Sequence, residues 1–280
     1  MKNKKRIALA AAVVLAVTAL PMTVFAAKKD KEEEKLSKVT LNEVAHSIFY
    51  APQYVAIEEG YFAEEGLDLT LVTGFGADKT MTAVISGEAD IGFMGAEASV
   101  YAYQEGATDP VVNFAQLTQR AGNFLVAREE MPDFKWEDLK GKKVLGGRKG
   151  GMPEMVFEYI LKKNGIDPQK DLTIDQSIDF GSTAAAFTGD DSAAYTVEFE
   201  PSATILEKEG GGYVVASLGE ASGYVPYTSY SAKVSYMEEN PEIIQKFTNA
   251  LQKGMNYVQI HPVRIPDFLS RYPDHNNVSL

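Results

Sequence analysis

The chain has 280 residues, enough for one large or two medium-sized domains, and its 45% hydrophobic and 24% charged content is typical of a globular protein. Its formal net charge of −12 argues against nucleic acid as a partner, because phosphate backbones repel an acidic chain. The chain contains no cysteine, which excludes disulfides, thiol nucleophiles and thiolate metal sites.

The first 26 residues have the parts of an export signal. Lys2 to Arg6 are mostly basic, an apolar run follows from Ile7 to Leu20, and Val24-Phe25-Ala26 is a small-x-small cleavage site. The alternative is a membrane anchor, but Pro21 and the cleavage site favour export. Residues 27–38 alternate in charge and cannot bury apolar surface, so we expect a flexible spacer. The protein is therefore expected outside the cytoplasm, released or in the cell envelope at the outer face of the cytoplasmic membrane.

The next stretch predicts a strand, an aromatic loop, a helix and a second strand. A β-rich run from Val39 to Val44 leads to Phe49-Tyr50, and a helix begins near Pro52. Leu67 to Val72 then alternates as a strand does. Because ligands of open α/β folds bind where strands end and helices begin, Phe49 and Tyr50 are candidate stacking residues.

The following turn, Gly74-Phe75-Gly76, has two possible roles. Its glycines allow a tight turn from strand to helix, or a close approach of backbone to ligand at the same sheet edge. Phe75 is a third candidate for stacking, and Gly76 is a candidate contact.

Glu97 opens a helix after the short buried strand Ile91–Gly95. An acid at a helix N-terminus complements the helix dipole, and the same carboxylate could bind an amine or amidine in a cleft. Two further strands are expected at 111–117 and 123–127. Arg120 between them could pair with an anionic ligand or be an exposed turn arginine.

A glycine-rich loop, Gly146 to Gly151, precedes the next helix. Free backbone N–H groups at such a helix start suit an anion or another polar group, and Arg148 is a fork donor, so Gly147, Arg148 and Gly151 are candidate ligand contacts. The loop lacks the spacing of a nucleotide P-loop.

Thr196, Glu198 and Glu200 share one face of an alternating strand that ends at Pro201. Two acids would be costly in an apolar core, so they must be solvated or face a polar cleft. We favour Glu198, with Thr196, as ligand-facing. A carboxylate pair also suits a glycosidase, but nothing else in the chain supports hydrolysis.

The last part of the chain predicts an apolar strand at 212–216, an aromatic return crossing at 224–232 and a long helix from Asn240-Pro241, with another helix at 264–271. The repeated strand–helix pattern indicates an α/β fold with mainly parallel sheets. We assign 39–133 and 226–280 to a discontinuous first lobe, expected to be truncated at its C-terminus, and 134–225 to a second lobe.

Three motifs carry a family resemblance that extends from about Val39 to Gln259. They are the stretch from Ser47 to Leu69 with its Gly60-Tyr61-Phe62 and Gly66-Leu67-Asp68 steps, the run from Ile85 to Phe93, and Asp138-Leu139-Lys140-Gly141-Lys142-Lys143-Val144. Together they resemble the solute-binding proteins of ABC importers, in the branch that binds sulfonates, taurine, nitrate or thiamine-type pyrimidines.

The resemblance implies a type II periplasmic-binding-protein fold, in which two lobes of mixed, mostly parallel sheets flanked by helices close about a hinge. It implies a monomer that binds a small molecule and docks on an ABC permease with its ATPase, without catalytic residues, metal or cofactor. In this family the glycine-rich loop faces the ligand from the second lobe.

The nature of the ligand stays open between two classes. The acids and aromatics favour a planar nitrogen heterocycle such as a thiamine-type pyrimidine, whereas Arg148 and the glycine loop favour a sulfonate or similar anion. Two acids in the cleft would repel an anion, so we prefer the heterocycle.

Two other classes of function compete with transport. One branch of the family resembles the pyrimidine synthase of thiamine biosynthesis, but that enzyme has a cysteine-rich motif, and this chain has no cysteine and only His46, His261 and His275. The third class is a sensory ligand-binding module that docks on a receptor.

Overall fold

The computed structural model describes residues 36–179 and 181–261. The predicted export signal, most of the spacer, the helix expected at 264–271 and the expected C-terminal truncation lie outside these residues. The last three spacer residues are described, and for two of them the prediction is wrong: Ser37 and Lys38 belong to the first strand and pair in register with Leu67 and Asp68.

The first sheet has five strands in the order β2-β1-β3-β10-β4. Strands β1, β2 and β3 are parallel, whereas β10 runs antiparallel to β3 and β4. The strands are β1 (Ser37–Glu43), β2 (Leu67–Thr73), β3 (Ile91–Gly95), β4 (Val111–Thr118) and β10 (Thr228–Lys233). The carboxyl ends of β1 to β3 therefore lie at one edge, together with the start of β10.

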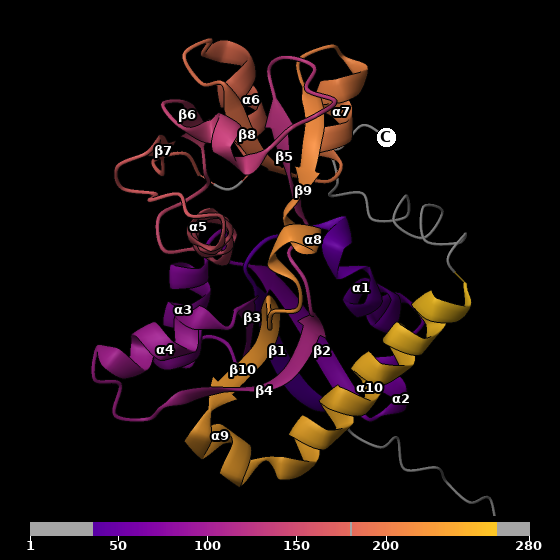
Figure 1. Ribbon diagram of the computed structural model, residues 1–280. Coiled ribbons are helices and arrows are strands. Elements are labelled where there is room, and N and C mark those ends of the chain that lie inside the picture. Colours follow the sequence, from indigo (N-terminus) through magenta and orange to yellow (C-terminus); the bar gives the residue numbers. More distant parts are fainter. Residues whose placement is uncertain (1–35, 180, 262–280) are drawn as a thin grey trace, which may run out of the picture. The chain divides into compact units, whose positions relative to one another are not determined.

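Helices cover both faces of this first sheet (Figure 1). The long amphipathic helix α10 packs on α1, and a Cβ at Gly254 would collide with the carbonyl oxygen of Pro52, so glycine permits the close crossing. The helices are η1 (Ile48–Tyr50), α1 (Ala51–Glu58), α2 (Tyr61–Glu64), α3 (Ala77–Ser86), α4 (Glu97–Gln104), α9 (Val234–Glu239) and α10 (Pro241–Ile260). Tyr230, in the predicted aromatic crossing, is fully buried in this core beside Phe93 and Phe247.

The second sheet also has five strands, in the order β7-β6-β8-β5-β9. Strand β6 is parallel to β7 and β8, and β5 is antiparallel to β8 and β9. The strands are β5 (Asn123–Ala127), β6 (Lys143–Leu145), β7 (Thr173–Asp175), β8 (Tyr195–Phe199) and β9 (Tyr213–Ser217), and the helices are η2 (Trp136–Leu139), α5 (Met152–Lys163), α6 (Thr183–Gly189), α7 (Ser202–Lys208) and α8 (Leu218–Ser222).

Strand β5 corrects the predicted lobe boundary. We expected Asn123–Ala127 in the first lobe, but this strand pairs with β8 and β9 of the second sheet. Local alternation of side chains identifies a strand but contains no information about its partner, so the boundary could not be found from the pattern alone.

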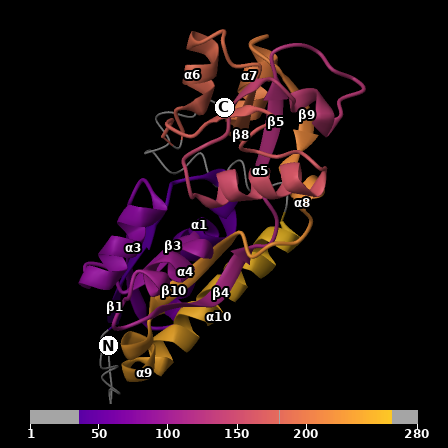
Figure 2. The ribbon, with the colours of Figure 1, turned by 60° about the vertical axis from the view of Figure 1, so that its left-hand side comes forward.

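Two segments connect the sheets, one between β4 and β5 and the other between α8 and β10 (Figure 2). They lie side by side, because the Val225 amide donates to the Gln119 carbonyl at 3.0 Å and the Tyr227 amide donates to the Thr118 carbonyl at 3.1 Å. Two adjacent crossings of this kind form a hinge. The two sheets with their helices thus form the two lobes of the predicted fold.

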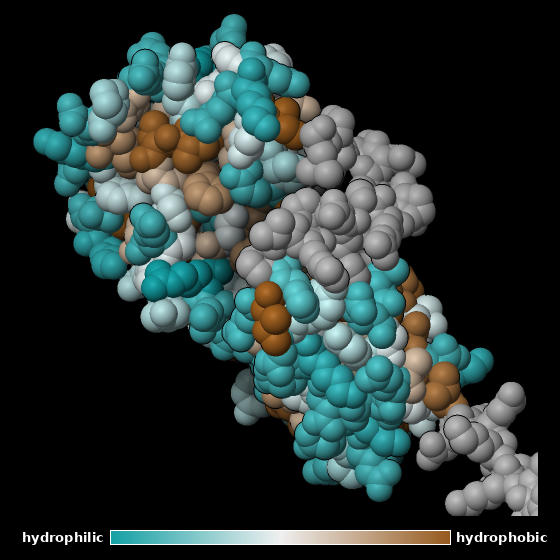
Figure 3. Space-filling model, turned by 90° about the vertical axis from the view of Figure 1, so that its right-hand side faces the viewer, coloured by the Kyte–Doolittle hydropathy of each residue, from teal (hydrophilic) through white to brown (hydrophobic). Residues whose placement is uncertain are grey.

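The face shown in Figure 3 is mainly hydrophilic, and its hydrophobic side chains form small groups separated by polar ones. Single exposed apolar residues are normal on a folded protein. Among the described residues, no helix has the length and apolarity needed to cross a bilayer.

Candidate ligand-binding site

The lobes contact each other where strand ends and helix starts meet, and α5 lies on the side of the second sheet that faces the first in both ribbon views (Figures 1 and 2). Arg148 Nη2 of the glycine loop lies 3.0 Å from Asp78 Oδ2 in the first turn of α3. The Tyr101 hydroxyl on α4 lies 3.1 Å from Met155 Sδ on α5. These contacts bring together the two groups of loops predicted to hold the ligand.

Phe49 and Tyr50 lie in this region, as the strand-end argument predicts. The Phe49 ring is centred 5.8 Å from that of Tyr227 and 5.9 Å from that of Phe199 on the second lobe. A Cβ at Gly122 in the first crossing would collide with the Phe49 ring, so glycine permits this packing. Phe49 is partly buried, whereas Tyr50 is 5% exposed and packs edge-on against Phe93.

A buried hydrogen-bond network supports this aromatic loop. Glu43, fully buried at the end of β1, accepts hydrogen bonds from Gln53 Nε2 (2.8 Å), the Tyr54 hydroxyl (2.9 Å) and Thr73 Oγ1 (3.1 Å). Its other contact is His46 Nδ1 at 2.7 Å. The Tyr54 oxygen also accepts from the Ser47 backbone amide at 3.0 Å, so the loop is tied to the network. Through its contact with Glu43, His46 belongs to this structural network, which agrees with a structural rather than a catalytic role for the histidine.

Glu97 begins α4, as predicted, and is only 8% exposed. Neither of its carboxylate oxygens has a hydrogen-bond partner with good geometry among the described residues. Burial raises the pKa of Glu97 to about 7, and the backbone N–H groups of Glu97 and Met152 partly oppose the shift. Met152 opens α5, so this carboxylate lies near the helix start of the opposite lobe.

Thr196 and Glu198 are almost fully buried on β8. The Glu198 oxygens accept from the Thr196 hydroxyl at 2.6 Å and the Thr183 hydroxyl at 3.0 Å. Burial raises the pKa of Glu198 to about 7, and the two hydroxyls partly oppose the shift. Glu198 is thus not solvated, as one of the two predicted alternatives required; the two hydroxyls compensate part of the cost of its burial. Its role as a ligand contact stays a prediction.

The glycine loop leads into α5 as predicted. Gly151 is the N-cap and Gly147 has a positive φ of 89°, a conformation that favours glycine. Glu154 fixes the loop by accepting from the Gly150 amide (3.3 Å) and Gln176 Nε2 (2.6 Å). Arg148, predicted to bind ligand, is paired with Asp78, so an anion would compete with a carboxylate for it.

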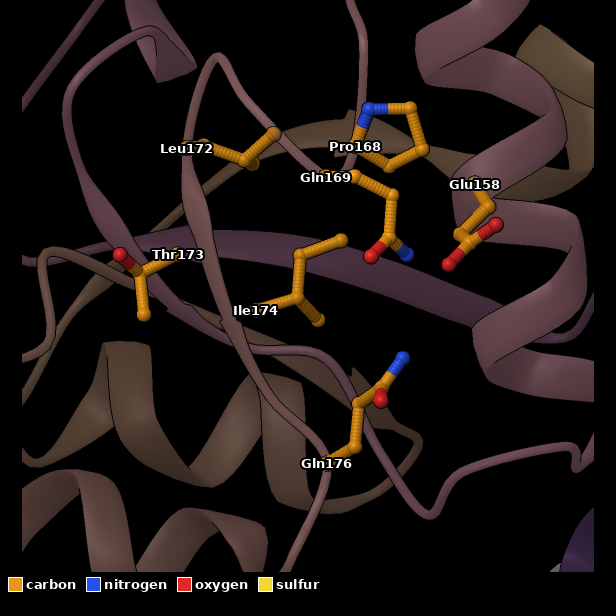
Figure 4. A pocket seen from close by; sticks show the side chains of 7 residues that line it. All are labelled: Glu158, Pro168, Gln169, Leu172, Thr173, Ile174 and Gln176. Carbon is orange, nitrogen blue, oxygen red and sulfur yellow. The ribbon is translucent and has the colours of Figure 1, made fainter.

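A surface pocket of about 280 Å³ lies behind this loop, between α5 and β7 (Figure 4). It includes none of the predicted site residues, and its lining consists of Glu158, Pro168, Gln169, Leu172, Thr173, Ile174 and Gln176.

Phe75 differs from the other predicted aromatics. It is 72% exposed and has a positive φ of 57°, which is unusual for a bulky residue. Gly76 has a φ of 151°, and a Cβ there would approach Arg148 Nη1 to 2.8 Å, so glycine allows the arginine to pack on the loop. The structure does not bring Phe75 into the buried aromatic group around Phe49.

Sequence reasoning missed two polar residues near this group. Asn123 is fully buried at the start of β5, and Tyr227 is 3% exposed just before β10. Both side-chain polar atoms of Asn123 and the Tyr227 hydroxyl have no hydrogen-bond partner among the described residues. The sequence did contain a signal for Asn123, because it is the one polar residue of the apolar strand Asn123-Phe124-Leu125-Val126-Ala127. Tyr227 had no signal beyond its aromatic surroundings.

The described residues contain no group of three or more His, Asp or Glu side chains placed to hold a metal ion.

Similar folds occur in solved structures of binding proteins. The alkanesulfonate-binding protein SsuA from Xanthomonas axonopodis, bound to MOPS, has a TM-score of 0.71 at 15% identity and covers 85% of this chain and 79% of its own. The nitrate-binding protein NrtA from Synechocystis has a TM-score of 0.68 at 16% identity, and the match covers 85% of this chain and 66% of NrtA. The predicted periplasmic-binding-protein fold is confirmed.

Sequence comparisons indicate the family. "Putative binding protein YtlA" of Bacillus subtilis is 52% identical over 240 residues, which are 86% of this chain and 72% of the relative. The riboflavin-binding protein RibY of Chloroflexus aurantiacus is 25% identical over 82% of this chain and 65% of its own. The 4-amino-5-hydroxymethyl-2-methylpyrimidine phosphate synthase THI11 of Saccharomyces cerevisiae is 24% identical over 82% of this chain and 69% of the synthase. The family model described as NMT1/THI5 like matches residues 48–265, and the chain therefore belongs to the NMT1/THI5-like family.

Proposed function

We propose that this protein is the extracytoplasmic solute-binding component of an ABC importer. It captures a small molecule between its lobes and delivers it to a membrane permease with its ATPase. The two adjacent crossings support this role, because they are the geometry of a hinge, and closure must be driven by a ligand that binds the closed form better.

The ligand we propose is a thiamine-type pyrimidine or a related nitrogen heterocycle. The Glu97 carboxylate carries this proposal: it is buried between the lobes, and no hydrogen bond of good geometry reaches it from the described residues. An unpaired buried carboxylate is costly, and an amino or protonated ring nitrogen would satisfy it. Phe49 and the neighbouring aromatics offer flat surfaces for such a ring.

The second candidate is an aliphatic sulfonate, taurine or nitrate. The glycine-capped start of α5 and Arg148 favour an anion. Against it, Asp78 already pairs with Arg148, and Glu97 would repel a negative charge. A pyrimidine synthase finds less support, because the chain has no cysteine for the synthase motif. A sensory module would bind its ligand in the same way and differ only in docking on a receptor in place of the permease.

Thermal shift and calorimetry on the purified protein test this proposal. The panel contains 4-amino-5-hydroxymethyl-2-methylpyrimidine, riboflavin, taurine, an alkanesulfonate and nitrate. We expect a nitrogen heterocycle to raise the melting temperature by mass action, and Glu97→Gln to weaken its binding by about tenfold or more, as the loss of a charged hydrogen bond does.

The exposed Glu88 provides the control, since Glu88→Gln removes an equal charge from the same lobe and should leave the affinity unchanged. A shift produced by sulfonates alone, and lost in Arg148→Met, would replace the heterocycle with an anion while keeping the transport role.

A further inference from the structure

Three polar side chains in the inter-lobe region make no hydrogen bond of good geometry with the described residues, and two of them have no role in the proposed capture of an amine. Both atoms of the Asn123 amide and the Tyr227 hydroxyl are buried, and the described part of the chain offers neither residue a hydrogen-bond partner for them. The third is the carboxylate of Glu97. Buried polar groups are hydrogen-bonded in the great majority of cases, so each exception requires an explanation.

The strand register locates Asn123 within the site. In β5 it shares a face with Leu125 and Ala127, which belong to the core beneath α5. Its partner across the ladder is Phe199, at the carboxyl end of β8. The Phe199 ring is centred 5.9 Å from that of Phe49 and 6.4 Å from that of Tyr227.

Tyr227 connects this corner to Glu97. Thr228, the residue after Tyr227, pairs with Gly95 across the ladder, and a Cβ at Gly95 would collide with the Glu97 carboxylate. In agreement with this placement, Tyr50 and Glu97 add to the effect of burial in raising the pKa of the Tyr227 hydroxyl. The Asn123 amide and the Tyr227 hydroxyl therefore lie beside the same aromatic rings, and the Glu97 carboxylate lies next to the strand end that follows Tyr227.

The chain pairs comparable residues elsewhere. Buried Asn42 accepts from Thr80 Oγ1 at 2.8 Å, and the fully buried Tyr230 hydroxyl donates to Gln53 Oε1 at 2.9 Å. An unpaired buried amide and an unpaired buried hydroxyl lower the stability of the fold. A protein keeps such groups where a ligand supplies the missing hydrogen-bond partners.

We propose that Asn123 and Tyr227 determine ligand specificity by binding a planar edge that presents a donor beside an acceptor. Asn123 Oδ1 accepts from the ligand's donor while Asn123 Nδ2 donates to the adjacent acceptor, a pattern found in aminopyrimidines and lactams. Tyr227 and Glu97 bind the neighbouring polar groups. Sulfonate and nitrate present acceptors only, so they would leave Asn123 Oδ1 and Glu97 unpaired. This inference rests on the proposed solute-binding function.

The test compares Asn123→Leu and Tyr227→Phe with the matched controls Asn42→Leu and Tyr230→Phe in the full chain. The probe is 4-amino-5-hydroxymethyl-2-methylpyrimidine, together with its analogue in which the ring nitrogen beside the amino group is replaced by C–H. Calorimetry gives the two dissociation constants, and thermal unfolding without ligand gives the melting temperature.

We expect Asn123→Leu to weaken binding of the pyrimidine by about tenfold or more and to abolish discrimination against the analogue. Because the variant removes an unpaired group, the melting temperature of the free protein should rise by about 2–4 °C. Tyr227→Phe keeps the ring and should weaken binding without lowering the melting temperature. Both controls should lower it, since they break hydrogen bonds made within the chain.

Opposite outcomes separate this inference from the proposed function. If wild-type protein binds the pyrimidine but Asn123→Leu and Tyr227→Phe lower the melting temperature and leave affinity and discrimination unchanged, the two residues are structural and the inference is overturned, while the binding function stands. If the wild-type protein binds only acceptor-rich anions, both the proposed ligand class and this inference are overturned. Should Asn123→Leu fail to fold, Tyr227→Phe decides the outcome alone.

Discussion

At the scale of single residues, two buried glutamates of the first lobe differ in what surrounds them. Glu43 is fully buried and contacts four side chains that donate or can donate to it, which compensates the cost of its burial. Glu97 is nearly as buried and has no such set among the described residues. Similar burial thus produces a structural carboxylate in one place and a candidate ligand contact in the other.

The raised pKa of Glu97 predicts that its ionisation destabilises the free protein. Its folded-state pKa of about 7 lies above the ordinary value of 4.5, so the folded state binds more protons between these values. The free energy of unfolding should therefore fall as pH rises from about 5 to 8, with a contribution from Glu97 of up to about 3 kcal/mol.

Denaturant unfolding of the wild-type protein and Glu97→Gln at pH 5, 6, 7 and 8 measures this contribution. The variant should be the more stable protein at pH 8, and its stability should fall less with pH. Burial raises the pKa of Glu154 and Glu198 as well, so part of the slope should persist. Parallel pH profiles of the two proteins would contradict the prediction.

At the scale of elements, the glycine loop and α3 are joined by the Asp78–Arg148 ion pair across the lobes. Both side chains are exposed by about half, 60% and 42%, so the pair should contribute less than about 1 kcal/mol. Because the pair joins the two lobes, we expect this energy to favour closure and hence ligand binding.

Asp78→Asn should accordingly weaken ligand binding by about two- to fivefold at low salt, and this difference should shrink at high salt, where exposed charges are screened. The melting temperature should change little. Asp167→Asn breaks an exposed ion pair with Lys170 inside the second lobe and provides the control. Stronger binding in Asp78→Asn would instead mean that Asp78 holds Arg148 away from the ligand.

At the scale of the whole molecule, the hinge predicts that ligand binding brings α4 and α5 together. Tyr101 and Met155 are in contact in the structure, and the absence of native cysteine allows a clean labelling experiment. The double variant Tyr101→Cys/Met155→Cys, treated with a short bismaleimide, should cross-link faster in the presence of ligand than without it. The single variants control for intermolecular reaction, and equal rates with and without ligand would argue against ligand-driven closure.

The sequence predicted most elements because their signals are local. Pro52 and Gly66 mark the ends of the first helical segment, and the alternation of Leu67 to Val72 identifies a strand, features that depend on neighbours within a few residues. The rule that ligands bind at strand ends also located Phe49, Tyr50, Glu97 and the glycine loop at the contact between the lobes. Their roles in binding remain predictions.

The remainder depended on contacts between distant parts of the chain. The sequence by itself determined the α/β class, the family motifs and the acidic, cysteine-free character, since these follow from composition and short-range pattern. Only the tertiary structure decided that β5 joins the second sheet and that Arg148 pairs with Asp78. It also decided that, within residues 36–179 and 181–261, Asn42 and Tyr230 find hydrogen-bond partners while Asn123 and Tyr227 do not. Whether a polar group is satisfied depends on partners up to 177 residues away, as for Tyr230 and Gln53, and no local pattern specifies them.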